Sequence, residues 1–171
     1  MIIINFILFQ LAWFACILGA AKATPWLGVA VTAVILTWHF HKARQAKLEA
    51  LLMLTALTIG AIFDQTMLSS HLINYAHHGW SVSIVPVWIL ALWLGFATAL
   101  NVSLRWMRSR QFTAVIFGAV GGPLAYLSAE KLGALTLQST NTYIALSIGW
   151  AIITPLLLAI STKFDGFKEL N

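Results

Sequence analysis

Residues 3–21 read IINFILFQLAWFACILGAA and contain no charged side chain. A helix needs about 20 such residues to cross the hydrocarbon core of a bilayer. Further apolar stretches follow near residues 25–41, 48–68, 82–104, 112–131 and 142–162. The sequence therefore predicts an all-α fold class, in which residues 1–171 form a single membrane domain, an integral bundle of six transmembrane helices.

The composition excludes several other classes of protein. Hydrophobic residues make up 60% of the 171 residues and charged residues only 9%, with a mean hydropathy of +0.87. Soluble domains carry about 25% charged residues, so a water-soluble domain is excluded. Scarce charge also argues against intrinsic disorder. The single cysteine, Cys16, excludes a disulfide scaffold and is expected to be a small buried hydrophobic side chain.

The first apolar stretch resembles a secretory signal only at its end, where alanines flank Lys22. No positive charge precedes it, and it is longer than the apolar region of about 7–15 residues in such signals. We therefore expect it to be a retained span.

The basic residues alternate between loops and predict the orientation of the chain. The loops after the second, fourth and sixth stretches hold Lys42, Arg44, Lys47, Arg105, Arg108, Arg110, Lys163 and Lys168. The alternate loops hold only Lys22 and Lys131. Because cytoplasmic loops are enriched in Lys and Arg, both termini are expected to be cytoplasmic. The net charge of +5 then indicates solvated anchors beside anionic lipid headgroups, and no nucleic-acid partner is expected.

Three amide side chains lie within the apolar stretches. Gln10 is expected near the middle of the bilayer, and Asn5 and Asn101 toward its cytoplasmic side. Polar side chains are costly in hydrocarbon. These amides are therefore predicted either to hydrogen-bond between helices or to contact a ligand.

A second group of polar residues is expected near the opposite membrane boundary. Asp64 and Glu130 should reach a similar depth, and His71 would lie two turns beyond Asp64 on the same helix face. His77 and His78 follow in the next loop. Such a cluster could bind a metal, relay protons or act as an acid–base pair. Adjacent histidines do not suit one ion, so we predict no metal site and treat the cluster as a solvated rim or a proton-handling site.

The fifth stretch contains Gly118 and Gly122, whose spacing permits close approach of another helix. Pro123 cannot donate a hydrogen bond to the carbonyl group of Ala119, so the sequence predicts a kink or break there. One interpretation is that the freed backbone faces a ligand cavity beside Tyr126. The other is a structural kink that allows tight packing.

Four ordered motifs resemble those of one bacterial family. They are Asn5-x-x-x-Phe9-Gln10-x-x-Trp13-Phe14, Pro86-x-Trp88, Asn101-x-Ser103-Leu104-Arg105-Trp106 and Gly121-Gly122-Pro123-Leu124-Ala125-Tyr126. Over essentially its whole length the chain is similar to the inner-membrane proteins grouped as domain of unknown function 2878, a family without an established reaction. The resemblance implies a bacterial inner-membrane location. Because members are associated with genes for fatty-acid methyltransferases and flavin-dependent oxidoreductases, it also implies a link to lipid modification.

These observations support three hypotheses. The first is a small protein that binds or handles a lipid or apolar ligand in envelope lipid modification, with Asn5, Gln10, Asn101, Pro123 and Tyr126 as candidate ligand-binding residues. The second is a proton-coupled transporter that uses Asp64 and Glu130, with His71 nearby. The third is a structural subunit of a membrane complex.

The sequence shows no nucleophile–base pair, so it identifies no catalytic residue and leaves open whether the protein is an enzyme. No cofactor is predicted. The expected partners are membrane lipids, together with a second copy of the chain or another membrane protein.

Overall fold

The computed structural model describes residues 1–168 and is built from six α-helices within that range. They are α1 (Ile2–Ala21), α2 (Trp26–Lys42), α3 (Ala46–Ser69), α4 (Val87–Leu100), α5 (Gln111–Lys131) and α6 (Thr140–Ser161). Four of them, α1, α3, α5 and α6, are long and apolar enough to cross a membrane. The all-helical prediction is confirmed at this level.

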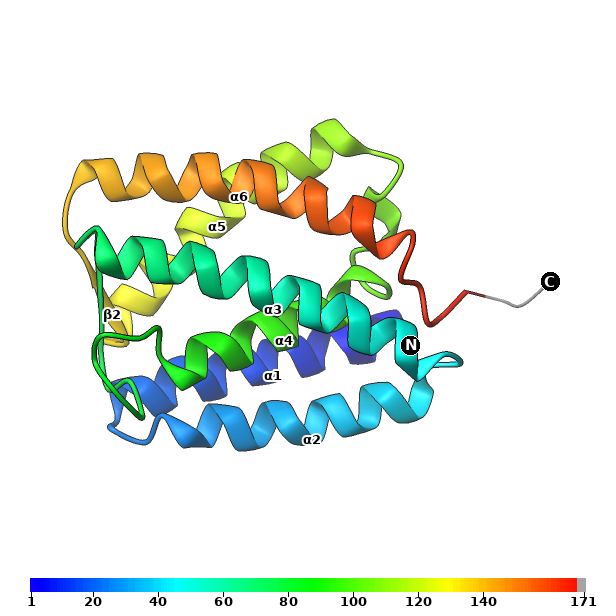
Figure 1. Cartoon of the computed structure of the whole chain (residues 1–171), viewed down its shortest axis with the longest axis horizontal. Helices are drawn as coiled ribbons and strands as arrows, with labels where there is room; N and C mark the ends of the chain where they lie inside the picture. The colour runs from blue at the N-terminus through cyan, green and yellow to red at the C-terminus, as the bar shows by residue number, and fades with distance from the viewer. Residues whose placement is uncertain (169–171) are drawn as a thin grey trace.

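The helices run alternately up and down the bundle (Figure 1). The helix α4 lies at its centre and packs against α1, α2 and α3, whereas α5 and α6 pack chiefly against each other. Most α4 side chains are buried, including Trp88, Trp93 and Phe96. A helix surrounded by protein on several sides is apolar on every face, which explains the continuous hydrophobic sequence of α4.

The fourth helix is shorter than the predicted span 82–104. Pro86 precedes it, and its ring fixes the backbone there without donating a hydrogen bond. The preceding residue is held in a loop, because Val85 N donates to Gln65 Oε1 (2.8 Å) and Val85 O accepts from Trp80 Nε1 (2.9 Å). At the other end the chain turns at Asn101 and continues into the short 3₁₀ helix η1 (Arg105–Met107).

A small sheet, which the sequence did not predict, joins two loops at one end of the bundle. Strand β1 (Ile73–Tyr75) pairs antiparallel with β2 (Leu135–Leu137), so that Tyr75 lies opposite Leu135. The carboxylate of Glu130 accepts a hydrogen bond from Leu137 N (2.7 Å) at the edge of this pair. The sheet therefore connects the α3–α4 loop with the α5–α6 loop and fixes the position of Tyr75.

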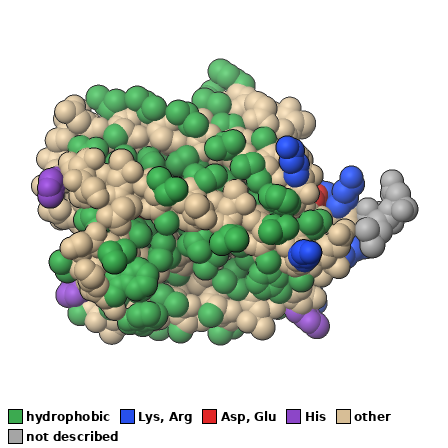
Figure 2. Space-filling model, in the orientation of Figure 1, with side chains coloured by type: hydrophobic (Ala, Val, Ile, Leu, Met, Phe, Trp, Pro, Cys, Tyr) green, Lys and Arg blue, Asp and Glu red, His purple; other side chains and the backbone are tan. Residues whose placement is uncertain are grey.

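The polarity of the bundle is the reverse of that of a water-soluble protein. The carboxylates of Glu49 and Asp64 are fully buried, whereas Ile62 and Ile152 on the outer helix faces are 64% and 60% exposed. Figure 2 shows hydrophobic side chains spread along the sides of the bundle, and Lys and Arg gathered at the end where α1 begins and α6 ends in Figure 1. Apolar outer faces on helices of spanning length are those of a membrane protein.

The helix α5 continues through Pro123 without a break. The carbonyl group of Ala119, which Pro123 leaves without its helical donor, accepts a hydrogen bond from Ser147 Oγ of α6 (2.9 Å). An added Cβ at Gly118 would lie 2.1 Å from the carbonyl oxygen of Trp150, so the glycines let the two helices touch. The freed backbone thus bonds to a neighbouring helix instead of facing a ligand, because α6 supplies the missing donor.

Candidate ligand cavity

A cavity of about 840 Å³ lies among α1, α4, α5 and α6. Its lining is mainly apolar and includes the aromatic side chains of Phe9, Trp13, Trp93, Phe96 and Trp150. The rings of Trp93 and Trp150 are stacked, with their centroids 4.9 Å apart. We refer to this space as the α1–α5 cavity, since α1 and α5 form its two sides. Its size and apolar lining are typical of small-molecule sites.

The cavity opens sideways, between α1 and α5. The lining residues Phe14 of α1 and Leu124 of α5 are about half exposed at the outer surface. Other lining residues, such as Trp88 and Thr154, are buried. The outer edge of the cavity is therefore apolar and lies on the side of the bundle.

Three buried polar atoms that belong to cavity-lining residues have no hydrogen-bond partner within residues 1–168. They are Trp150 Nε1, Thr154 Oγ1 and Ser103 Oγ. The N–H of Trp150 nevertheless lies near the hydroxyl group of Tyr126 and interacts with it, outside the geometry of a good hydrogen bond. Most buried polar groups in proteins are paired. All three atoms are almost completely covered by surrounding protein atoms, so the structure does not show any of them facing open space in the cavity.

The wall of the cavity also contains Asp64 of α3, whose carboxylate accepts hydrogen bonds from side chains of three other elements. Its Oδ1 accepts hydrogen bonds from the hydroxyl groups of Tyr75 (2.6 Å) and Tyr126 (2.5 Å), and its Oδ2 accepts one from Trp93 Nε1 (2.6 Å). We call these four residues the Asp64 cluster. All three partners donate, so Asp64 acts here only as an acceptor and ties α3 to β1, α4 and α5.

Tyr75 is the member of the Asp64 cluster that lies outside the helices. Burial raises the pKa of its phenol well above the usual value, and the negative charge of Asp64 raises it further. The hydroxyl group of Tyr75 therefore keeps its proton throughout the physiological pH range and remains a donor to Asp64.

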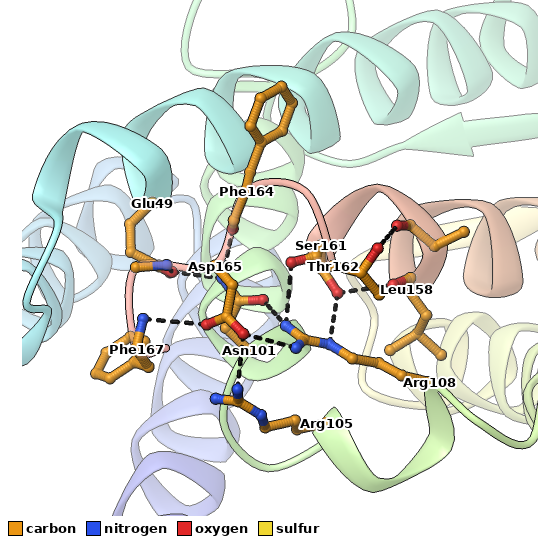
Figure 3. Close-up of polar contacts among 12 residues, drawn as sticks. Glu49, Asn101, Arg105, Arg108, Leu158, Ser161, Thr162, Phe164, Asp165 and Phe167 are labelled. Atoms are coloured by element: carbon orange, nitrogen blue, oxygen red, sulfur yellow. Dashed lines mark hydrogen bonds and ion pairs between the residues drawn. The ribbon is translucent and has the colours of Figure 1, made fainter. Parts of the chain in front are cut away.

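A second polar network closes the end of the bundle at which the basic residues gather (Figure 3). The buried carboxylate of Glu49 contacts His39 Nε2 (2.8 Å) and accepts hydrogen bonds from Asn101 Nδ2 and from Gly166 N (2.8 Å). Asn101 Nδ2 also donates to the carbonyl oxygen of Phe164 (2.8 Å). Glu49 and Asn101 therefore hold the segment after α6 against the ends of α2, α3 and α4.

Arg108 extends this network. It donates to Asn101 Oδ1, to Ser161 Oγ (2.9 Å) and to Asp165 Oδ2 (2.8 Å). Arg105 pairs with the same Asp165 oxygen (2.7 Å). We call His39, Glu49, Asn101, Arg108 and Asp165 the Glu49 cluster. The expectation that Arg108 is a solvated anchor is wrong, because its guanidinium group is largely buried among these acceptors.

A family model described as "Protein of unknown function (DUF2878)" matches residues 2–156 of the chain. The chain belongs to this family. No curated protein and no solved structure matches it. The resemblance drawn from the four sequence motifs is thereby confirmed. The matched residues of this DUF2878 protein include the whole Asp64 cluster and the cavity-lining side chains of Trp150 and Thr154.

The DUF2878 structure divides the candidate ligand-binding residues between different places. Gln10 and Tyr126 line the α1–α5 cavity. Asn101 belongs to the Glu49 cluster, because α4 ends just before it and turns its side chain toward the segment after α6. Asn5 donates to the carbonyl oxygen of Thr98 (3.1 Å) and so links α1 to α4. Pro123 is not among the cavity-lining residues.

The structure does not bring the second predicted group together. His71 is exposed beyond the end of α3, and Glu130 accepts its hydrogen bond from Leu137 N. Asp64 instead binds the two tyrosines and Trp93, which approach it from other elements. His78 Nδ1 contacts the carbonyl oxygen of Ile84 (2.7 Å). Within residues 1–168, no three His, Cys, Asp or Glu side chains are grouped as a metal site.

Proposed function

We propose that this DUF2878 protein crosses the bacterial inner membrane six times, with both termini in the cytoplasm. The gathering of Lys and Arg at one end supports this orientation. The shorter α4 would cross as a buried central helix, shielded from lipid by its neighbours.

Cysteine labelling tests this topology. Ser109 and Thr136 are exposed at opposite ends of the bundle. In spheroplasts, an impermeant maleimide is expected to label a Thr136→Cys variant and to leave a Ser109→Cys variant unlabelled until the membrane is permeabilised. Labelling of Ser109→Cys from outside would contradict the orientation. The buried Cys16 provides the background control.

The function that the geometry supports best is the binding of a lipid or another apolar ligand in the α1–α5 cavity. One observation carries this proposal: an apolar cavity of about 840 Å³ among α1, α4, α5 and α6, with exposed apolar side chains of α1 and α5 at its outer edge. An apolar body would fill the space, and Gln10, Tyr126 and Trp150 would surround the polar head. The proposed setting is envelope lipid modification, which the family resemblance implies.

Filling the cavity with a side chain tests the proposal. An added Cβ at Gly121 meets no atom within 4 Å, and Gly121 lines the cavity. A Gly121→Leu substitution is therefore expected to fold normally and to reduce co-purified lipid or apolar ligand by about fivefold or more, since a buried leucine displaces ligand contacts. Native mass spectrometry and lipid extraction in mild detergent measure this loss.

The matched control is Val120→Leu, the neighbouring position, whose side chain is half exposed on the outer surface. It is expected to retain ligand as the natural chain does. Equal retention by both variants, or no retained ligand in the natural protein in several detergents, would contradict the proposed binding function.

Proton-coupled transport is the second candidate, favoured by the presence of a buried carboxylate, Asp64, in the cavity wall. The predicted pairing of Asp64 with Glu130 has no support, because the carboxylate of Glu130 accepts a hydrogen bond from Leu137 N of β2. Uptake into proteoliposomes that is unchanged by Asp64→Asn would remove this candidate.

A further inference from the structure

The polar side chains that line the α1–α5 cavity differ in their capacity to bind a ligand, and this step rests on the proposed binding function. Within residues 1–168, most of their polar groups hydrogen-bond to protein atoms or are covered by them. The bonded groups belong to Asp64, Trp88, Trp93, Tyr126 and Ser128. The covered groups belong to Ser103, Trp150 and Thr154. Lys131 is exposed at the end of α5, so the groups that remain between the two ends of the bundle are on α1.

Gln10 of α1 has an amide group that is neither paired nor completely covered. In the described part of the chain it makes no hydrogen bond, and neither amide atom is enclosed by protein in the way that Trp150 Nε1 is. Its side chain is partly exposed and lines the cavity. Trp13, also in the lining, has an indole N–H in the same state. Both side chains therefore have free hydrogen-bonding capacity.

The helical repeat places Gln10 on the cavity side of α1. The α1 residues in the lining are Phe6, Phe9, Gln10, Trp13, Phe14 and Ile17. At about 3.6 residues per turn they form a single stripe, and Gln10 lies near its middle. With a rise of about 1.5 Å per residue, Gln10 is about 12 Å from Ile2 and about 16 Å from Ala21 along the helix axis. In the proposed topology the amide is thus within the hydrocarbon, where no water can pair with it.

The chemistry of the amide specifies the group that completes it. A glutamine side chain offers an acceptor oxygen as well as an NH₂ donor. The alkyl chain of an ordinary phospholipid pairs with neither, and a carbonyl group pairs with the donor alone. A hydroxyl group can donate to Gln10 Oε1, while its oxygen can accept a hydrogen bond from Gln10 Nε2 or from Trp13 Nε1.

We propose that the α1–α5 cavity binds a lipid that carries a hydroxyl group on its hydrocarbon part, such as a hydroxylated acyl chain, and that Gln10 recognises this hydroxyl group. Gln10 Oε1 accepts its hydrogen bond. The hydrocarbon on either side of the hydroxyl group lies against Phe9 and Phe96, which line the cavity beside Gln10. Gln10 is then the residue that distinguishes this lipid from those with plain chains.

Three probes of one chain length separate recognition of the hydroxyl group from apolar filling: 8-pentadecanol, 8-pentadecanone and pentadecane. The delipidated natural protein in dodecyl maltoside receives each probe at the same mole fraction, and native mass spectrometry measures the bound fraction. We expect 8-pentadecanol to bind about fivefold or more tightly than either other probe, the ratio that one hydrogen bond provides.

A Gln10→Met variant tests the amide, because methionine keeps the length of the side chain and removes both polar atoms. It is expected to lower 8-pentadecanol binding about fivefold and to leave pentadecane binding unchanged. Since Gln10 has no partner within residues 1–168, the unliganded variant should unfold at the same temperature as the natural protein or higher. Gln111→Met, at an exposed position outside the cavity, is the matched control and should change no probe's binding.

The outcomes distinguish the two proposals. Failure of all three probes to bind would overturn the binding function itself. Equal binding of the three probes, binding of the ketone as tight as that of the alcohol, or 8-pentadecanol binding unaffected by Gln10→Met would overturn the hydroxyl assignment, while apolar binding would stand. A lower unfolding temperature of unliganded Gln10→Met would show that the amide bonds within the protein, and it would also overturn the assignment.

Discussion

Replacement of Asp64 by asparagine is expected to destabilise the protein by about 3 kcal/mol. Asparagine keeps one acceptor oxygen, but its NH₂ group would face at least one of the donors that now bind the carboxylate. A buried donor left without an acceptor costs about 1–3 kcal/mol. Unfolding in dodecyl maltoside, followed by tryptophan fluorescence, measures the change.

Glu130→Gln is the matched control for this prediction. Glu130 is also near a helix end and accepts one hydrogen bond, from Leu137 N. A glutamine carbonyl oxygen can accept the same bond, so the expected loss is below about 1 kcal/mol. Equal stability of the two variants would show that the Asp64 cluster does not hold α3, α4 and α5 together.

The second large effect is expected at Glu49. In a Glu49→Gln variant, His39, Asn101 and Gly166 N would compete for one acceptor oxygen in a fully buried site. Breaking a buried charged network in this way costs about 3–5 kcal/mol. The segment after α6 would then be released from the bundle, and trypsin would cleave at Lys163 faster than in the natural protein.

Arg105→Gln provides the comparison for the tail. Arg105 pairs with Asp165, but its side chain is 42% exposed, and exposed ion pairs contribute at most about 1 kcal/mol. Its cleavage rate should stay close to that of the natural protein. Similar trypsin sensitivity in Glu49→Gln and the natural protein would refute the anchoring role of Glu49.

The helices were predictable because a stretch that is apolar and long enough to cross the bilayer core forms a helix almost independently of its tertiary contacts. The stretch 142–162 became α6 at Thr140–Ser161, for example. The predicted span 82–104 was longer than α4 because its first residues form a loop, which is held by hydrogen bonds to side chains distant in the sequence, such as Gln65 of α3. The two strands have three residues each, which is too short for a periodic pattern to reveal.

The polar clusters were only partly predictable. The sequence predicted Asp64 near a membrane boundary in a group with Glu130 and His71, and Tyr126 beside a ligand cavity. Their meeting depends on the packing of α3 against α4 and α5, which no local pattern specifies. Glu49 lies 117 residues from Gly166 in the chain. In the first turn of α3, close to basic residues of the preceding loop, its carboxylate could not be distinguished by sequence from a solvated charge.

The sideways opening between α1 and α5 has a thermodynamic consequence for any ligand. On the proposed function, a ligand would enter there from the surrounding leaflet without passing through the aqueous phase. Occupancy would then depend on the mole fraction of the compound among the lipids. Two compounds with equal intrinsic affinity would saturate the protein at different total doses if their membrane partition coefficients differed.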